Sequence, residues 1–130
     1  MTENEISRIV VDAAYCIHKH FGPGLQETVY EVCLAHELRK RGLEVERQKV
    51  ISVKYDSITF QEGFRADLVV DDKVVLEVKS VEHLHRVHKK QLLTYLRLMN
   101  KRLGLLINFN EDLIRDGISR VVNGLPEDDQ

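Results

Sequence analysis

Apolar residues in the first part of the chain recur every three or four positions, which is the spacing of one face of a helix. The positions on this face are Ile6, Ile9, Val10, Ala13 and Ile17. Thr2 and Glu5 have the spacing of a capping box, so the first helix is expected to begin beside them. The segment Gly22-Pro23-Gly24 is expected to end it, because proline cannot continue a helix and glycine permits a sharp turn. A second helix is predicted from about residue 25 to residue 41.

After residue 44 the helical spacing gives way to alternation, which predicts strands. Strands are expected over 45–55 and 58–70, joined by a turn, with Gly63 marking a bulge in the second. The remaining elements are a strand at 74–80, a helix at about 84–100, a strand at 103–108, a short helix or loop at 111–116 and an edge strand at 118–122. This order predicts an α/β protein with a central mixed β-sheet, built from a β-meander and a helical crossover and flanked by α-helices.

Length and composition favour a single domain. The chain has 130 residues, of which 43% are hydrophobic and 31% charged, so one domain is expected over 1–125. Residues 126–130 form a polar tail that is expected to be disordered. No apolar run is long enough to cross a membrane, and the first residues lack the pattern of a signal peptide, so a cytoplasmic protein is expected. Cys16 and Cys33 are then expected to be reduced thiols within the core.

The stretch VVLEVKS, residues 74–80, carries two charges inside an otherwise apolar strand pattern. Residues two apart in a strand point to the same side, so Glu77 and Lys79 share one face while the apolar residues between them share the other. One interpretation of this face is a solvated surface with a cross-strand salt bridge. A functional interpretation requires a partner for the two charges on a neighbouring strand.

Asp67 on the preceding strand is that partner if the hairpin has the right register. A three-residue loop at 71–73 pairs Val70 with Val74, and the same register pairs Asp67 with Glu77 and Arg65 with Lys79. A two-residue loop would place Asp67 opposite an apolar residue and send the two carboxylates to opposite faces. The register that brings the carboxylates together is the one predicted here.

Two opposed carboxylates repel each other unless a proton or a cation lies between them. Mg²⁺ suits such a pair, because it takes one or two protein carboxylates and completes its octahedron with water and phosphate. Asp67, Glu77 and the backbone carbonyl of Val78 are therefore candidate ligands of Mg²⁺ or Mn²⁺. Lys79, one pleat along, is placed to orient the attacking water or to neutralise a phosphate.

These residues resemble the core motif of the PD-(D/E)XK nuclease superfamily: Asp67 is followed after nine residues by Glu77-Val78-Lys79. The residue before Asp67 is Ala66, where the motif in its name has proline. Gln91 and Tyr95, four apart on the next predicted helix, resemble the Q-x-x-x-Y element of the RecB-like nucleases. Gly24, Glu27 and Tyr30 resemble the signature of the GxxExxY family within the same superfamily.

The resemblance implies a restriction-endonuclease-like core and a metal-dependent nuclease that acts on nucleic acid, with DNA as the expected substrate. It implies that Glu27 completes the metal site and that Gln91 reaches toward the metal or the DNA strand. Tyr30 and Tyr95 would then support the site. The locally basic segment after the third strand is expected to meet the phosphate backbone through His85, Arg86, Lys89 and Lys90.

A second hypothesis is a nucleic-acid-binding or protein-interaction module that keeps the fold without turnover. The formal net charge of −2 and the small size of the chain favour it, because a bare core has little room for a substrate-reading domain. The intact pair of carboxylates and the lysine beside it count against it. Either hypothesis is compatible with a homodimer or with a larger protein partner.

Overall fold

Helix α1 (Glu3–Phe21) opens the fold and is capped as the sequence predicts. The hydroxyl of Thr2 accepts a hydrogen bond from the backbone N–H of Glu5 at 3.1 Å, and the Glu5 carboxylate accepts one from the N–H of Thr2 at 2.9 Å. The helix ends at Gly22, whose φ of 70° lies in the left-handed region that glycine adopts readily. The computed structural model from which these observations come describes residues 1–126.

Tyr30 fixes the turn between α1 and helix α2 (Glu27–Lys40), which begins two residues later than expected. Its hydroxyl donates to the carbonyl of Gly22 at 2.6 Å and accepts from the N–H of Leu25 at 3.1 Å. Its ring is buried and stacks on Phe109 with a centroid separation of 4.5 Å. The tyrosine of the G-x-x-E-x-x-Y pattern is therefore buried and holds the loop that precedes α2 through two hydrogen bonds.

Five strands form one mixed sheet in chain order: β1 (Val45–Tyr55), β2 (Ile58–Val70), β3 (Val74–Lys79), β4 (Leu103–Asn108) and β5 (Ile118–Val122). Strands β3 and β4 are parallel and are connected by helix α3 (Arg86–Met99), while the other neighbours are antiparallel. A short 3₁₀ helix, Ile114–Gly117, precedes β5 and overlaps the predicted helix-or-loop segment. The predicted α/β architecture, with its meander and helical crossover, is confirmed.

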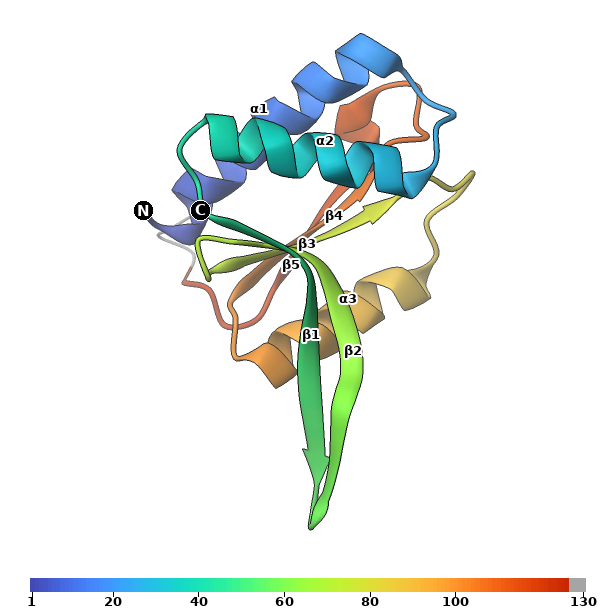
Figure 1. Ribbon diagram of the computed structural model, residues 1–130. Helices are drawn as coiled ribbons and strands as arrows, with labels where there is room; N and C mark the ends of the chain where they lie inside the picture. The colour runs from blue at the N-terminus through green and yellow to red at the C-terminus, as the bar shows by residue number, and fades with distance from the viewer. Residues whose placement is uncertain (127–130) are drawn as a thin grey trace.

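Helices cover both faces of the sheet. Helices α1 and α2 lie on one face and α3 lies on the other (Figure 1). The larger core, which includes Leu68 and Leu76, lies on the side of α1 and α2. The smaller core joins Val75 to Leu92 and Leu96 of α3. Strand β3 is therefore covered on both sides, which explains its near-continuous run of apolar residues.

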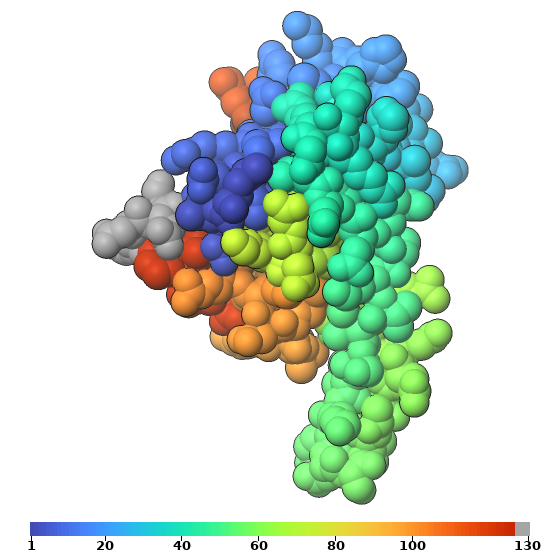
Figure 2. Space-filling model, turned by 60° about the vertical axis from the view of Figure 1, so that its left-hand side comes forward, coloured from blue at the N-terminus to red at the C-terminus, as the bar shows by residue number. Residues whose placement is uncertain are grey.

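The hairpin of β1 and β2 extends beyond the helices as an arm, residues 50–65 (Figures 1 and 2). Tyr55, Ile58 and Phe60 near its tip are more than half exposed. The pairing of β1 with β2 shifts register opposite Gly63, as the predicted bulge requires. A Cβ on Gly63 would lie 2.3 Å from Cγ2 of Val53, so only glycine fits this point of the arm.

Three further expectations concern the two cysteines, the C-terminal tail and membrane-spanning segments, and their outcomes differ. Cys16 and Cys33 are free thiols. The expectation that they lie in the core is wrong for Cys16, which is exposed, whereas Cys33 is half-buried and packs against the larger core. Of the tail expected over 126–130, residues 127–130 lie outside the described residues. Within residues 1–126, no helix has the length and apolar character needed to span a membrane.

Candidate active site

The hairpin between β2 and β3 has the register predicted from its three-residue loop. Leu68 pairs with Leu76, and Val70 pairs with Val74. The loop closes through a hydrogen bond of 3.0 Å from the N–H of Lys73 to the carbonyl of Val70. The ladder ends at Leu68 and Leu76, because β2 turns away there into the arm. This ladder does not reach Arg65, which is paired only on its other side, with Val50 of β1, so the expected pairing of Arg65 with Lys79 is wrong.

Beyond the end of this ladder, β2 and β3 are joined by hydrogen bonds between side-chain carboxylates and backbone N–H groups. The N–H of Val78 donates to Oδ2 of Asp67 at 2.8 Å, and the N–H of Asp67 donates to Oε2 of Glu77 at 2.8 Å. Ala66 and Val69 both pack against α3 although they are three residues apart, so the alternation of β2 shifts by one residue at Asp67. The two carboxylates thus hold the strands together at the point where the strands separate.

Burial makes this carboxylate pair electrostatically unfavourable. The side chain of Glu77 is only 5% exposed, and burial together with the charge of Asp67 raises its pKa to about 8. The pKa of half-buried Asp67 is also raised, first by burial and then by the negative charge of Glu31, although the N–H of Val78 opposes the shift. The solvated surface considered for the charged face of β3 is therefore excluded for Glu77.

The donor set suits a hard divalent cation. Each carboxylate gives one oxygen to a backbone N–H, and Oδ1 of Asp67 receives only a long contact of 3.5 Å from Nε2 of Gln48. A cation beside the remaining oxygens would offset the repulsion between the two charges. Among residues 1–126, no three or more His, Cys, Asp or Glu side chains are close enough to form a metal cluster. Mg²⁺ is usually held by one or two protein carboxylates and keeps several water ligands, so two carboxylates are enough for it.

Lys79 is half-buried at the end of β3 beside these carboxylates. Its backbone carbonyl accepts from the N–H of Phe109 at 2.9 Å, which anchors the end of the strand. In the described part of the chain its ammonium group forms no ion pair within 4.0 Å, so the cross-strand salt bridge considered for this residue is not formed. Its charge remains available for an anion.

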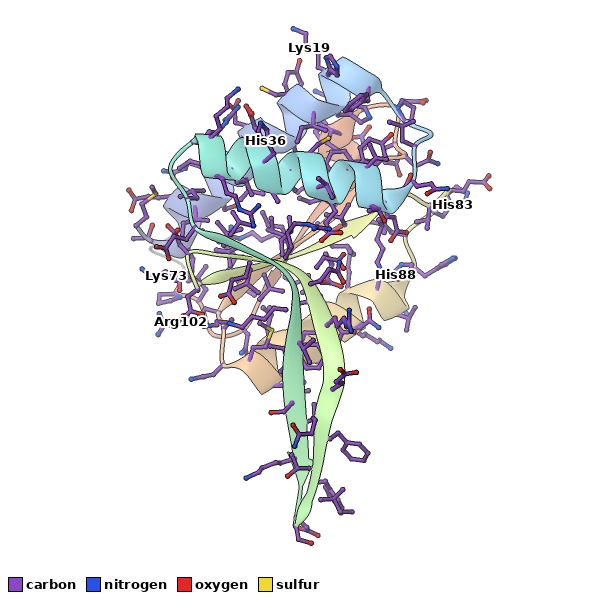
Figure 3. The ribbon with its side chains drawn as sticks, viewed as in Figure 1. Lys19, His36, Lys73, His83, His88 and Arg102 are labelled. Carbon is purple, nitrogen blue, oxygen red and sulfur yellow. The ribbon has the colours of Figure 1, made fainter. Side chains whose placement is uncertain are left out.

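His88, which belongs to the locally basic segment of the sequence, also lies in this region. It lies in the first turn of α3, on the opposite side of the sheet from α2 (Figure 3). Its Nδ1 accepts a hydrogen bond from the N–H of His85 at 3.0 Å. Its pKa is lowered, first by burial and then by the positive charge of Lys79. The His88 ring is therefore within electrostatic reach of Lys79.

Two glutamates on α2 face the carboxylate pair in different ways. Glu27, predicted to complete the site, is exposed in the first turn of the helix. Glu31, one turn further on, is 5% exposed and accepts a hydrogen bond of 2.9 Å from Nε2 of Gln48. Glu31 has a larger effect than Glu27 on the pKa of Asp67. The four-residue spacing places Glu27 and Glu31 on one face of α2, but nothing in the sequence indicates that Glu31 lies near Asp67.

The Q-x-x-x-Y element lies on α3. Tyr95 is half-buried and stacks on Phe64 of β2, with a centroid separation of 4.0 Å. Its pKa is raised by burial and by the charges of Glu77 and Asp67, so its ring lies within electrostatic reach of the pair. Gln91 is exposed on the same helix. Its contact with substrate stays a prediction.

The basic residues predicted to meet phosphate are not gathered on one uniformly positive surface. A hollow on the surface is lined by three of these basic residues, His85, Arg86 and Lys89, and also by Glu111 and Asp116. Lys90, the residue after Lys89, is exposed. The two acids reduce the positive potential of this hollow. The role of these residues in binding phosphate stays a prediction.

Comparison with models of known protein families found a match for most of the chain. A model of the PD-(D/E)XK nuclease superfamily matches residues 4–121. The chain belongs to the PD-(D/E)XK nuclease superfamily. Its mixed sheet between helices is consistent with the restriction-endonuclease-like fold of that superfamily, whose nucleases act on nucleic acid and generally use divalent metal ions. Searches of curated proteins and of solved structures found no match.

Proposed function

We propose that this member of the PD-(D/E)XK superfamily is a metal-dependent nuclease that hydrolyses phosphodiester bonds, with DNA as the expected substrate. The observation that carries the proposal is the reciprocal pair of hydrogen bonds that holds the Asp67 and Glu77 carboxylates together in a buried position. Such a pair destabilises the fold unless a proton or a cation joins it, and Lys79 lies beside it without an ion-pair partner within 4.0 Å among the described residues. The GxxExxY and RecB-like patterns support the same proposal.

In this proposal Asp67, Glu77 and the carbonyl of Val78 hold Mg²⁺ or Mn²⁺. When bound, the metal supplies a Lewis acid and lowers the pKa of a coordinated water. Hydrolysis adds water across the phosphodiester: the water oxygen bonds to phosphorus, and the bond to the departing sugar oxygen breaks as that oxygen gains a proton. Lys79 stabilises the negative charge that gathers on the phosphate. Glu27 assists at the exposed edge of the site.

The remaining parts of the proposal concern substrate contact and context. Gln91 orients the nucleic-acid strand, and Tyr95 supports it through the ring of Phe64. His85, Arg86, Lys89 and Lys90 contact the phosphate backbone. Residues 1–125 act as one nuclease-like domain, alone, as a homodimer or beside a larger protein. The cytoplasm is the expected compartment because both cysteines are free thiols.

A non-catalytic binding module is the second candidate, and one observation favours it. The arm exposes Tyr55, Ile58 and Phe60, and exposed apolar surface of this kind marks interaction sites. A module that only binds has no need of a buried pair of carboxylates whose repulsion lowers its stability. The two functions therefore differ in whether the pair matters for turnover.

Cleavage assays with defined variants test the nuclease proposal. Single-stranded, double-stranded and branched DNA, and RNA of matched sequence, would be incubated with Mg²⁺ or Mn²⁺. We expect metal-dependent cutting by the wild type that is lost in Glu77→Ala and Lys79→Met. Glu44→Gln and Lys40→Met remove the same kinds of charge from exposed positions and serve as matched controls. Equal cutting by all five proteins would place the activity outside this site and favour the binding module.

A further inference from the structure

Gln48 has a backbone conformation that is unusual for its place in the fold. Its φ is 51°, in the left-handed region, although it lies inside strand β1. The other non-glycine residues with positive φ in the described chain are Asp56, Asp71, Asp72 and Asn100. Those four are Asp or Asn in turns or at a helix end, where this conformation is common. A glutamine held this way within a strand indicates a local constraint that the surrounding structure imposes.

The side chain of Gln48 bridges two carboxylates. Its Nε2 lies 2.9 Å from Oε1 of Glu31 on α2 and 3.5 Å from Oδ1 of Asp67 on β2. Both neighbours are acceptors, so the NH₂ end of the amide must face them, and its two hydrogens can serve one carboxylate each. Its flanking residues in β1 pair with Leu68 and Ala66, which places Gln48 directly across from Asp67.

The left-handed backbone alone does not explain a glutamine here. Glycine adopts positive φ without the steric cost that any Cβ adds, so a simple kink in β1 would favour glycine. Glutamine has this steric cost, but its side-chain amide contacts both Glu31 and Asp67. The amide is therefore the feature that this position provides.

We propose that Gln48 is a positioning residue, which holds the carboxylates of Glu31 and Asp67 at a fixed separation so that Asp67 is aligned to bind the metal. This role rests on the proposed function, and it assigns Gln48 and Glu31 to the site. Without the amide, Glu31 keeps only the 3.5 Å contact from the guanidinium of Arg47, and Asp67 keeps only the N–H of Val78 at 2.8 Å. No group then joins the two like charges, and the free oxygen of Asp67 loses the contact that fixes its direction. Gln48 acts through Asp67 and does not itself touch the metal or the phosphate.

Substitution by glycine separates the amide from the backbone. Gln48→Gly keeps the left-handed conformation, so we expect it to fold, with a melting temperature somewhat below that of the wild type because the hydrogen bond to Glu31 is lost. We expect its affinity for Mn²⁺, measured by calorimetry without nucleic acid, to fall by about 10–100-fold, the usual effect of losing a partner that orients a ligand.

Two controls keep the result interpretable. Lys49→Gly places glycine at the next residue of β1 and is expected to lower the melting temperature while leaving Mn²⁺ affinity unchanged. Gln48→Asn tolerates positive φ but its amide is one methylene shorter, so it should fold and bind Mn²⁺ more weakly than the wild type even if Gln48→Gly fails to fold.

The outcomes separate this inference from the proposed function. Wild-type affinity for Mn²⁺ in Gln48→Gly, or in Gln48→Asn if the glycine variant does not fold, would show that Gln48 only shapes the backbone and would overturn its positioning role. The nuclease proposal would survive that result. Failure of the wild type itself to bind Mn²⁺ or Mg²⁺ would overturn the metal site, and the positioning role with it.

Discussion

Two buried polar groups lie on neighbouring strands of the sheet and differ in how completely they are satisfied. Asn108, at the end of β4, is fully buried and makes three hydrogen bonds: its Oδ1 accepts from the N–H groups of Val81 and Asn110, and its Nδ2 donates to the carbonyl of Val81. The Asp67 and Glu77 carboxylates also have hydrogen bonds, but they carry like charges whose burial raises both pKa values.

This difference distinguishes a polar group that serves the fold from one that serves a site. The amide of Asn108 is neutral and its bonds tie the segment after β3 to β4, so its burial stabilises the protein. The carboxylate pair is rigidly held, yet it lowers stability whenever both members are ionised. The stability of the protein should therefore change in opposite directions when Glu77 and Asn108 are each replaced.

The largest effect is expected for Glu77→Gln. The amide keeps an acceptor for the N–H of Asp67 and offers a donor to its carboxylate, so the metal-free protein should gain of the order of 2–3 kcal/mol at pH 8. Loss of the charge should reduce metal-dependent cleavage on the order of 10³-fold. Chemical denaturation and cleavage rates measure the two effects. The comparison fails if Glu77→Gln is less stable than the wild type or as active as Glu44→Gln.

Asn108→Ala should show the reverse pattern. Three hydrogen bonds are lost and a small cavity is left, so we expect a loss of about 2–4 kcal/mol in the free energy of unfolding. The affinity for Mn²⁺, measured well below the melting temperature, should stay within a few-fold of the wild type. A large loss of metal affinity in a folded Asn108→Ala would mean that the two polar groups are not independent.

The stability of the metal-free protein should fall as the pH rises from about 4.5 toward about 8. Glu77 has a raised pKa of about 8, so in this window the folded state binds more protons than the unfolded state, and stability then declines with pH. Glu77→Gln should remove most of this slope, while Asn108→Ala should keep it. Because the metal competes with protons, Mg²⁺ should stabilise the wild type more at pH 8 than at pH 6. Thermal melts across this range measure each slope, and a wild-type slope of the opposite sign would contradict the assignment.

The elements of this fold were predictable because their signals are local. Strands β1, β2, β4 and β5 have the predicted bounds, and the bulge at Gly63 and the capping box at Thr2 are where the sequence places them. The register that joins Asp67 to Glu77 followed from the length of one loop. Period, caps and loop length each depend on a few adjacent residues, so one sequence is enough to read them.

The parts of the site that were missed depend on the path of β2 after Asp67. The turn into the arm ends the ladder with β3, which removes the pairing of Arg65 with Lys79 and brings β1 across the site. Gln48 and Glu31 then meet Asp67 although they lie 19 and 36 residues before it. No periodic pattern encodes such a meeting. Cys16 was misplaced because it lies beside the buried face of α1, which holds Ala13 and Ile17, and not on it.

The G-x-x-E-x-x-Y pattern contains one residue that stabilises the fold, Tyr30, and one that is proposed to serve the site, Glu27. Substitutions of these two residues should give the smallest of the expected effects, one on stability and the other on cleavage. Tyr30→Phe keeps the stack on Phe109 but loses the bonds to Gly22 and Leu25, so we expect about 1–2 kcal/mol less stability and unchanged Mn²⁺ affinity. The side chain of Glu27 is exposed, so Glu27→Gln should leave the free energy of unfolding unchanged. It should lower the cleavage rate several-fold, because Glu27 lies at the edge of the site. Denaturation and single-turnover cleavage of both variants make the test. If Glu27→Gln cleaves at the wild-type rate, Glu31 is the glutamate of α2 on which the site depends, and Glu27 belongs with the helix rather than with the chemistry.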